Sequence, residues 1–227
     1  LVRYGVAPDH VSIRSVRDTL DRVLDKPGVR FIGNVEIGRD LTVAELHEYF
    51  DAIVFTYGAS RDRALGVPTA KSAVVVGVGN VAIDVTRVLA KTVGELDHTD
   101  MPQHVLDTLG RSGITDVHIL GRRGPAQATF TTKELRELGE LLEADVVVDP
   151  EDVVLDAASE ATVGSDKAVA RNVEVIREWS TRSLTGKPRR VHVHFLARPV
   201  ELRGDDRVRE VVVERTELDG RGGVTGT

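Results

Sequence analysis

One glycine-rich segment constrains the fold of this chain more than any other feature. Residues 73–76 are apolar without interruption, which is typical of a parallel strand buried on both faces. They lead directly into Gly77-x-Gly79-x-x-Ala82. In this fingerprint the first glycine allows a tight turn, the second lets the backbone approach a pyrophosphate, and a small third residue lets the next helix pack closely. We therefore expect a strand, a turn and a helix, with an anion at the helix N-terminus.

The segment after the turn has helical periodicity over residues 80–91. Its apolar residues fall on one stripe of a helix: Val81, Ala82, Val85, Val88 and Leu89. We expect this stripe to pack against the strand. On the fingerprint alone, an ordinary glycine turn in an α/β domain is the alternative interpretation.

A second apolar strand ends in a pair of arginines. Residues 117–120 are followed by Gly121, Arg122 and Arg123, and no acid stands between Ile119 and Gly124. At this position an NAD site usually carries an acid that holds the ribose 2'-hydroxyl. A guanidinium group instead pairs with phosphate through two parallel hydrogen bonds. The arginine pair therefore predicts NADP(H) as the dinucleotide.

Composition excludes several other classes of function. A formal net charge of -6 argues against general binding to nucleic acid. The absence of cysteine excludes disulfides, thiolate metal sites and iron–sulfur ligation by this chain. No apolar run approaches the roughly 20 residues that a bilayer requires. The chain starts at Leu1 without a signal-peptide pattern, so we expect a fragment of a longer protein. The excess of arginine over lysine weakly favours a bacterial, cytoplasmic protein, with the mitochondrial matrix as the alternative.

The rest of the chain alternates between helical and strand patterns. We expect helices over residues 12–24, after Thr42-x-x-Glu45, over 131–142 and within 151–186. We expect strands over residues 29–32, 34–37, 52–59 and 145–148, and an antiparallel hairpin formed by 191–196 and 208–215 around Gly204-Asp205-Asp206.

Four segments together carry a resemblance to a known family. They are residues 1–10, 33–40, 77–84 and 121–137. The last combines Gly121-Arg122-Arg123-Gly124-Pro125 with Phe130-Thr131-x-x-Glu134. In this order they closely resemble the adrenodoxin reductase family of ferredoxin:NADP reductases, over residues 1–150 and more faintly through the hairpin.

The resemblance implies a doubly wound, Rossmann-like α/β fold with two nucleotide sites. Residues 69–227 would form an NADP-binding domain with an antiparallel hairpin or meander, and residues 1–68 part of an FAD-binding domain. Hydride would pass between NADPH and FAD, and single electrons would leave to a ferredoxin-type iron–sulfur protein. The family's flavin-binding glycine motif and a second flavin segment lie outside this chain. The family also has a few tens of residues between Pro68 and Ser72, where only three stand here.

The resemblance also implies the following site residues. The NADP contacts fall on Val78, Gly79, Asn80 and Val81, and those at the adenosine ribose phosphate on Arg122, Arg123 and Glu134. The flavin contacts include Leu1 and Ile37. His10 and Glu137 would pair and steer the nicotinamide ring.

Two of these assignments have a simpler structural alternative. Glu134 also fits the third position of a capping box opened by Thr131, and His10 fits a turn residue beside Pro8. His192 and His194 have an i, i+2 spacing that some metal sites share, but no third ligand is evident, so we expect a solvent-facing pair and no metal.

A positively charged docking patch for an acidic ferredoxin is a further hypothesis. It consists of Arg136, Lys167 and Arg171, because complementary charge speeds the encounter of redox partners. Ordinary solvated helix charges are the alternative. For the whole chain, two other functions stay open: an NADP-binding module of an amidotransferase-linked synthase flavoprotein, and a catalytically inactive NADP-binding fragment.

Overall fold

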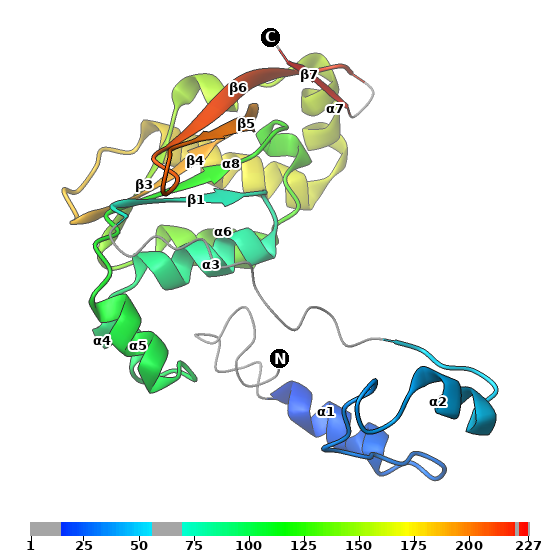
Figure 1. Ribbon diagram of the computed structural model, residues 1–227. Coiled ribbons are helices and arrows are strands. Elements are labelled where there is room, and N and C mark those ends of the chain that lie inside the picture. Colours follow the sequence, from blue (N-terminus) through cyan, green and yellow to red (C-terminus); the bar gives the residue numbers. More distant parts are fainter. Residues whose placement is uncertain (1–14, 56–69, 221–222, 227) are drawn as a thin grey trace. The chain divides into compact units, whose positions relative to one another are not determined.

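The computed structural model describes residues 15–55, 70–220 and 223–226 (Figure 1). The described residues belong to two compact units. Residues 15–55 form the smaller unit, and the residues from 70 onward form the larger one. Among the described residues, no helix is long and apolar enough to cross a lipid bilayer.

A parallel four-stranded sheet is the centre of the larger unit. Its strands are β1 (Ser72–Val76), β2 (Asp116–Leu120), β4 (Arg189–His194) and β3 (Ala144–Val148), in that spatial order. The register aligns Val76 with Leu120 and Leu120 with His194. The two strands predicted from their apolar runs are thus confirmed. Because they are parallel and in register, the glycine turn and the arginine pair leave the sheet at the same edge.

Three helices cover one face of this sheet: α3 (Asn80–Ala90), α6 (Thr132–Gly139) and α8 (Lys167–Thr181). Their apolar side chains and alternate residues of the strands form one continuous core. Its largest members are Ile83, Ile119, Phe130, Leu135, Leu138, Leu141, Ile176, Trp179 and Phe195. This core fixes α3 and α6 against the strands whose ends carry the two motifs.

The buried face of α3 differs from the predicted stripe. Ala82 is buried as expected, but the side chains of Val81 and Val85 are 60% and 37% exposed. Ile83 and Arg87 are buried in their place. The prediction counted apolar residues only, whereas α3 packs against both the sheet and α6. A charged residue faces α6, so the buried stripe is rotated around the helix.

The predicted hairpin is wrong in its first strand. Residues 189–194 form β4, which lies between β2 and β3 in the parallel sheet. The antiparallel sheet consists of β5 (Ala197–Arg203), β6 (Glu210–Leu218) and β7 (Val224–Gly226). Alternating valine and histidine in β4 resembles an edge strand, but strand order is decided by the packing of both faces. The predicted turn is correct: Gly204 has φ +143°, and a Cβ there would lie 1.9 Å from the Arg207 carbonyl oxygen.

Shorter elements complete the larger unit. They are α4 (Val93–Leu96) and α5 (Gln103–Gly110), which share a small apolar cluster, the 3-10 helices η2 (Pro125–Gln127) and η3 (Pro150–Val153), and α7 (Ala157–Ser165). The helical prediction over residues 151–186 is therefore confirmed as α7 and α8. The helix predicted over residues 131–142 is shorter than expected, because α6 ends at Gly139.

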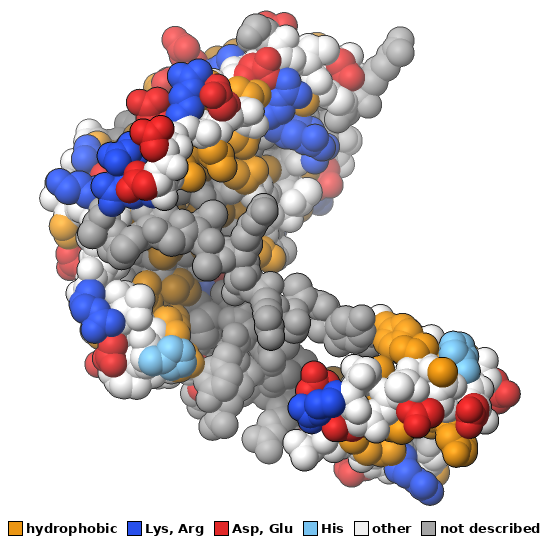
Figure 2. All heavy atoms as spheres, viewed as in Figure 1, with side chains coloured by type: hydrophobic (Ala, Val, Ile, Leu, Met, Phe, Trp, Pro, Cys, Tyr) orange, Lys and Arg blue, Asp and Glu red, His pale blue; other side chains and the backbone are white. Residues whose placement is uncertain are grey.

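The smaller unit contains α1 (Ser15–Leu24) and α2 (Val43–Tyr49), and α2 begins with the predicted capping box. The expected strands over residues 29–32 and 34–37 are not formed, and residues 52–55 are not in a strand. Residues 56–59 lie outside the described residues. Phe31, Ile32 and Val54 are 76%, 69% and 80% exposed, and Figure 2 shows hydrophobic side chains at the surface of this unit. A strand needs a hydrogen-bonding neighbour and an apolar cover, and residues 15–55 supply neither.

Candidate dinucleotide-binding site

The glycine turn has the geometry that the fingerprint predicts. Gly77 has φ +121°, a conformation that side-chain-bearing residues rarely adopt, and its N–H donates to the Leu120 carbonyl at 2.9 Å. Gly79 is the N-cap of α3 and provides no side-chain cap. The first N–H groups of a helix have no partner within the helix, so an uncapped N-terminus favours an anion.

A groove of about 370 Å³ runs beside this turn. It is lined by Val75, Val76, Gly77, Gly79, Asn80, Val81, Ala82, Val85 and Thr129. Three of the predicted NADP contacts therefore lie together along one groove. Its wall is largely apolar and the helix N-terminus is polar, a combination that suits a flat ring joined to a phosphate.

Val78, the fourth predicted contact, does not line the groove. It packs against the apolar core. A Cβ at Gly121 would lie only 2.7 Å from a γ-carbon of Val78. Glycine at 121 thus lets the glycine turn approach the start of the arginine segment closely.

The loop that precedes α6 is hydrogen-bonded to the glycine turn. The Thr129 N–H and hydroxyl donate to the Val78 carbonyl at 2.8 and 3.2 Å. The Thr131 N–H donates to Oδ1 of Asn80 at 2.8 Å. The Asn80 side chain therefore holds the loop in place. The sequence analysis did not predict Thr129 as a site residue. In the structure its hydroxyl lies only 3.2 Å from a Cβ built on Gly79.

Arg122 and Arg123 follow β2 at the same edge as the glycine turn. Their backbone is held firmly: the Thr216 hydroxyl donates to the Arg122 carbonyl at 2.7 Å, and the Leu196 N–H donates to the Arg123 carbonyl at 3.1 Å. The Arg122 side chain is exposed and that of Arg123 is half-buried. Within the described part of the chain, neither guanidinium forms a hydrogen bond or an ion pair. The pair is thus fixed at its backbone and open to a phosphate.

Glu134 and Glu137 lie on α6 and both contact a buried arginine. Oε2 of Glu134 is 2.7 Å, and Oε2 of Glu137 3.2 Å, from Nη1 of Arg87. The Thr131 hydroxyl accepts from the Glu134 N–H at 3.4 Å, so half of the alternative capping box is present. The Thr131 N–H binds Asn80 instead of the Glu134 carboxylate.

The remaining predicted residues belong to the N-terminal part of the chain. Leu1 and His10, the predicted partner of Glu137, lie outside the described residues. Ile37 is 44% exposed and forms an isolated bridge with Leu41. The structure therefore does not bring the predicted flavin contacts together within its described residues.

The two histidines of β4 are not a simple solvent-facing pair. His118 of β2 stacks on His192 with ring centroids 4.5 Å apart, and its Nδ1 lies 3.1 Å from Nε2 of His194. His192 also lies 3.0 Å from a carboxylate oxygen of Asp116. Burial lowers the pKa of His118 and of His194. No group of three possible metal ligands is present among the described residues.

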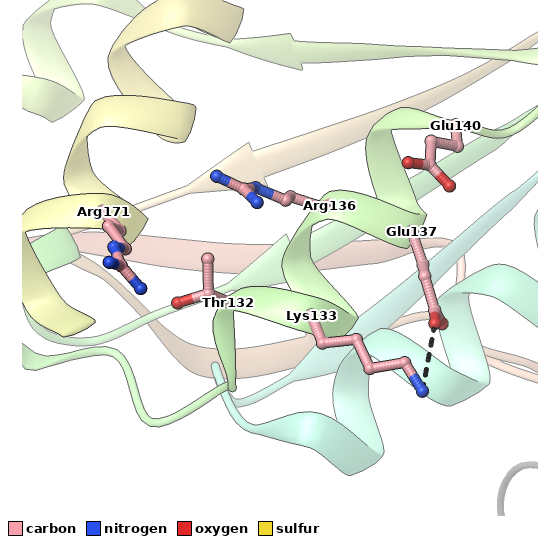
Figure 3. A pocket seen from close by; sticks show the side chains of 6 residues that line it. All are labelled: Thr132, Lys133, Arg136, Glu137, Glu140 and Arg171. Atoms are coloured by element: carbon pink, nitrogen blue, oxygen red, sulfur yellow. Dashed lines mark ion pairs between the residues drawn. The ribbon is translucent and has the colours of Figure 1, made fainter.

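A larger depression of about 700 Å³ lies between α6 and α8. Figure 3 shows its lining side chains, which are Thr132, Lys133, Arg136, Glu137, Glu140 and Arg171. Arg136 and Arg171 extend from the two helices toward this space, while Lys133 pairs with Glu137 at 3.8 Å. The depression is lined by two of the three predicted docking residues, Arg136 and Arg171. The third, Lys167, is the first residue of α8. In the described part of the chain, none of the three docking side chains is paired.

The parallel sheet, the glycine turn and the covering helices define a Rossmann-like α/β protein of the dinucleotide-binding class. The chain is 38% identical, over 99% of its length, to the NADPH-ferredoxin reductase FprA of Mycobacterium tuberculosis. It belongs to the adrenodoxin reductase-like family of ferredoxin:NADP reductases.

Other comparisons agree with this assignment. The mitochondrial NADPH:adrenodoxin oxidoreductase of Arabidopsis thaliana is 32% identical over 98% of this chain. The structure of Mycobacterium tuberculosis FprA in complex with NADPH superposes with a TM-score of 0.86, at 36% identity, over all of this chain and 57% of that chain. No family model matches the sequence.

The chain spans about half the length of the curated relatives it matches, 56% for the Mycobacterium tuberculosis reductase and 54% for the Arabidopsis protein. The alignment with the former covers 259 positions and is longer than the 227 residues of this chain. The relative therefore contains internal residues that have no counterpart here.

Proposed function

We propose that this chain is the NADPH-binding part of a ferredoxin:NADP reductase. In the complete protein, hydride passes between NADPH and FAD, and single electrons pass to a small iron–sulfur protein. The observation that carries this proposal is the position of the open Arg122–Arg123 pair, which leaves the sheet at the same edge as the uncapped N-terminus of α3. FprA of Mycobacterium tuberculosis, a relative of this chain, is an NADPH-ferredoxin reductase and forms a complex with NADPH.

The described residues fit NADPH well. The pyrophosphate binds the N–H groups that follow Gly79, and Asn80 and Val81 line the adjoining groove. Arg122 and Arg123 bind the 2'-phosphate through charge-assisted hydrogen bonds. Hydride transfer requires no general base from the protein. The role of this domain is to bind the coenzyme in a single orientation.

The fit to FAD is incomplete within this chain. We infer that residues 1–68 belong to an FAD-binding domain and residues 69–227 to the NADP-binding domain. Residues 18–55 are almost entirely exposed and do not by themselves enclose a flavin. FAD supplies the exchange between two-electron and one-electron chemistry when bound. The second candidate function is therefore an NADP-binding module without turnover. Because the exposed N-terminal unit does not enclose a flavin, we expect the isolated chain to bind NADP(H) and not to oxidise it.

The iron–sulfur partner is proposed to bind the docking patch, Arg136, Lys167 and Arg171. These cations come from two helices that flank one depression, and the described part of the chain leaves them without carboxylate partners. An acidic ferredoxin would therefore meet a local positive surface on a protein that is negative overall. We further propose a cytoplasmic location in a bacterium, with the mitochondrial matrix as the alternative that the mitochondrial relatives suggest.

The experiment that tests the function is reduction of a ferredoxin by the complete protein. Purified protein should show flavin absorbance, oxidise NADPH much faster than NADH, and reduce a bacterial ferredoxin. The isolated 227-residue chain should bind NADPH without oxidising it. A complete protein that binds no flavin, or that uses both coenzymes equally, would contradict the proposal.

A further inference from the structure

The backbone of the arginine pair is held by β6 and by the turn between β4 and β5. The Thr216 hydroxyl on β6 donates to the Arg122 carbonyl at 2.7 Å. The Leu196 N–H in the turn donates to the Arg123 carbonyl at 3.1 Å. Thr216 follows Arg122 by 94 positions in the chain, so a distant segment fixes the path of the arginine pair.

Thr216 connects these two contacts to each other. It is 1% exposed, and its N–H donates to the Leu196 carbonyl at 2.8 Å. Its hydroxyl is the donor to Arg122, and a valine of nearly the same shape has no donor. Without the hydroxyl, the Arg122 carbonyl would either stay unpaired beside an apolar group or move toward water.

The turn at Leu196 has an unusual backbone conformation. Leu196 has φ +52°, which residues with a side chain rarely adopt. Such a conformation persists where the surrounding structure holds it, and it is often found at functional sites. The preceding Phe195 N–H donates to the buried carboxylate of Asp152 at 2.9 Å, and Arg215 pairs with the same carboxylate at 2.6 Å. These contacts keep the Leu196 N–H directed at the Arg123 carbonyl.

Pairing of the parallel strands ends before the arginine pair. The last residue pair of β2 and β4 is Leu120 with His194. The hydrogen bonds to the Arg122 and Arg123 carbonyls therefore fix a loop and do not extend this strand pair. A loop that must become ordered when it binds a ligand loses affinity, and a backbone held in advance avoids that loss.

We propose that Thr216 is a positioning residue that sets the strength of the preference for NADPH over NADH. By holding the Arg122 carbonyl, its hydroxyl fixes the point from which both guanidinium side chains extend toward the 2'-phosphate. NADH lacks this phosphate and gains nothing from the arrangement. The inference rests on the proposed function, because it assumes that Arg122 and Arg123 bind the 2'-phosphate.

The test compares Thr216→Val with Thr216→Ser in the complete protein. Valine removes the donor and serine keeps it. Dissociation constants for NADP+ and NAD+ are measured by calorimetry at fixed ionic strength, and folding is checked by circular dichroism and thermal unfolding. We expect the valine variant to lose on the order of tenfold in its preference for NADP+ over NAD+, which corresponds to about 1.4 kcal/mol. The serine variant should retain the preference.

Thr99→Val is the matched control for a general loss of stability. Thr99 lies between α4 and α5, and its hydroxyl also donates to a backbone carbonyl, that of Leu96, at 2.6 Å. The same substitution thus removes the same kind of hydrogen bond in another part of the unit. It should lower the unfolding temperature and leave the coenzyme preference unchanged.

The arginine pair supplies a second test of the same role. In a protein that already carries Arg122→Ala and Arg123→Ala, adding Thr216→Val should not weaken NADP+ binding further, because the side chains through which Thr216 acts are absent. A purely structural role would give the same loss in both backgrounds. Should Thr216→Val not fold, Thr216→Ala removes the same donor and takes its place in both backgrounds.

The outcomes distinguish the inference from the proposed function. A wild-type protein that prefers NADP+, together with a folded Thr216→Val variant of unchanged preference, overturns the inference alone. An equal loss of preference in Thr216→Ser or in Thr99→Val overturns it as well. A wild-type protein without any preference for NADP+ would instead refute the proposed function.

Discussion

The arginine pair offers the sharpest test of the proposed coenzyme site. We consider the double variant Arg122→Ala and Arg123→Ala in the complete protein. Neither guanidinium has a partner within the described residues, and the backbone of both residues is held by hydrogen bonds from Thr216 and Leu196. Removing the side chains should therefore leave the free energy of unfolding nearly unchanged. Any effect should appear in coenzyme binding.

The size of that effect follows from the two contacts. A hydrogen bond to a charged group contributes about 1.5 to 3 kcal/mol. Because Arg122 is exposed and Arg123 only half-buried, we take the lower end for each. The pair then contributes about 3 kcal/mol to the binding of NADPH, or roughly a hundredfold or more in affinity. Binding of NADH, which lacks the 2'-phosphate, should change little.

The assay is a fluorescence or calorimetric titration with NADPH and with NADH at fixed ionic strength. The matched control is Arg136→Ala with Arg171→Ala, which removes the same charge from the depression between α6 and α8. It should leave the coenzyme preference intact. If the Arg122/Arg123 double variant kept the wild-type preference for NADPH, these residues would not bind the 2'-phosphate.

Three further predictions concern the turn, the partner surface and pH. Gly79→Val should weaken NADPH binding by roughly tenfold or more with an unchanged circular dichroism spectrum, since a side chain would block the pyrophosphate; tight binding by this variant would place the pyrophosphate elsewhere. Arg136→Glu with Arg171→Glu should slow ferredoxin reduction, most strongly at low salt, and leave flavin reduction by NADPH near normal in stopped flow; equal ferredoxin rates at low salt would remove the patch from the mechanism. Burial lowers the pKa of His118 and His194 in the folded state. The free energy of unfolding should therefore be highest above about pH 6.5, where both histidines are neutral in the folded and in the unfolded chain. It should decrease as the pH falls through that value, because the unfolded chain then binds more protons than the folded one. Thermal unfolding between pH 5 and 8 should show a weaker pH dependence for His118→Val, and an identical dependence would contradict this cause.

Local chemistry determined much of the proposed coenzyme site in advance. The turn at Gly77 requires a backbone conformation that glycine adopts readily, and the absence of an acid near Arg122 and Arg123 is visible in the sequence. Because β1 and β2 are parallel and in register, the two motifs lie at one edge of the sheet. The capping box at Thr42 was also predictable from local sequence, because it depends only on two residues three positions apart.

Contacts between distant segments decided the rest. Residues 189–194 alternate like an edge strand, but they lie between β2 and β3 because one face packs on the helices. That placement brings His118 onto His192, 74 positions later in the chain, which no local pattern indicates. Arg87 has the pattern of a surface residue, and only the approach of α6 buries it against Glu134. The sequence by itself thus determined the chemistry of the turn and of the arginine pair, where the cause lies within a few residues. Tertiary structure decided which charged residues are buried and which neighbours they have, because burial depends on segments that the sequence order does not bring together.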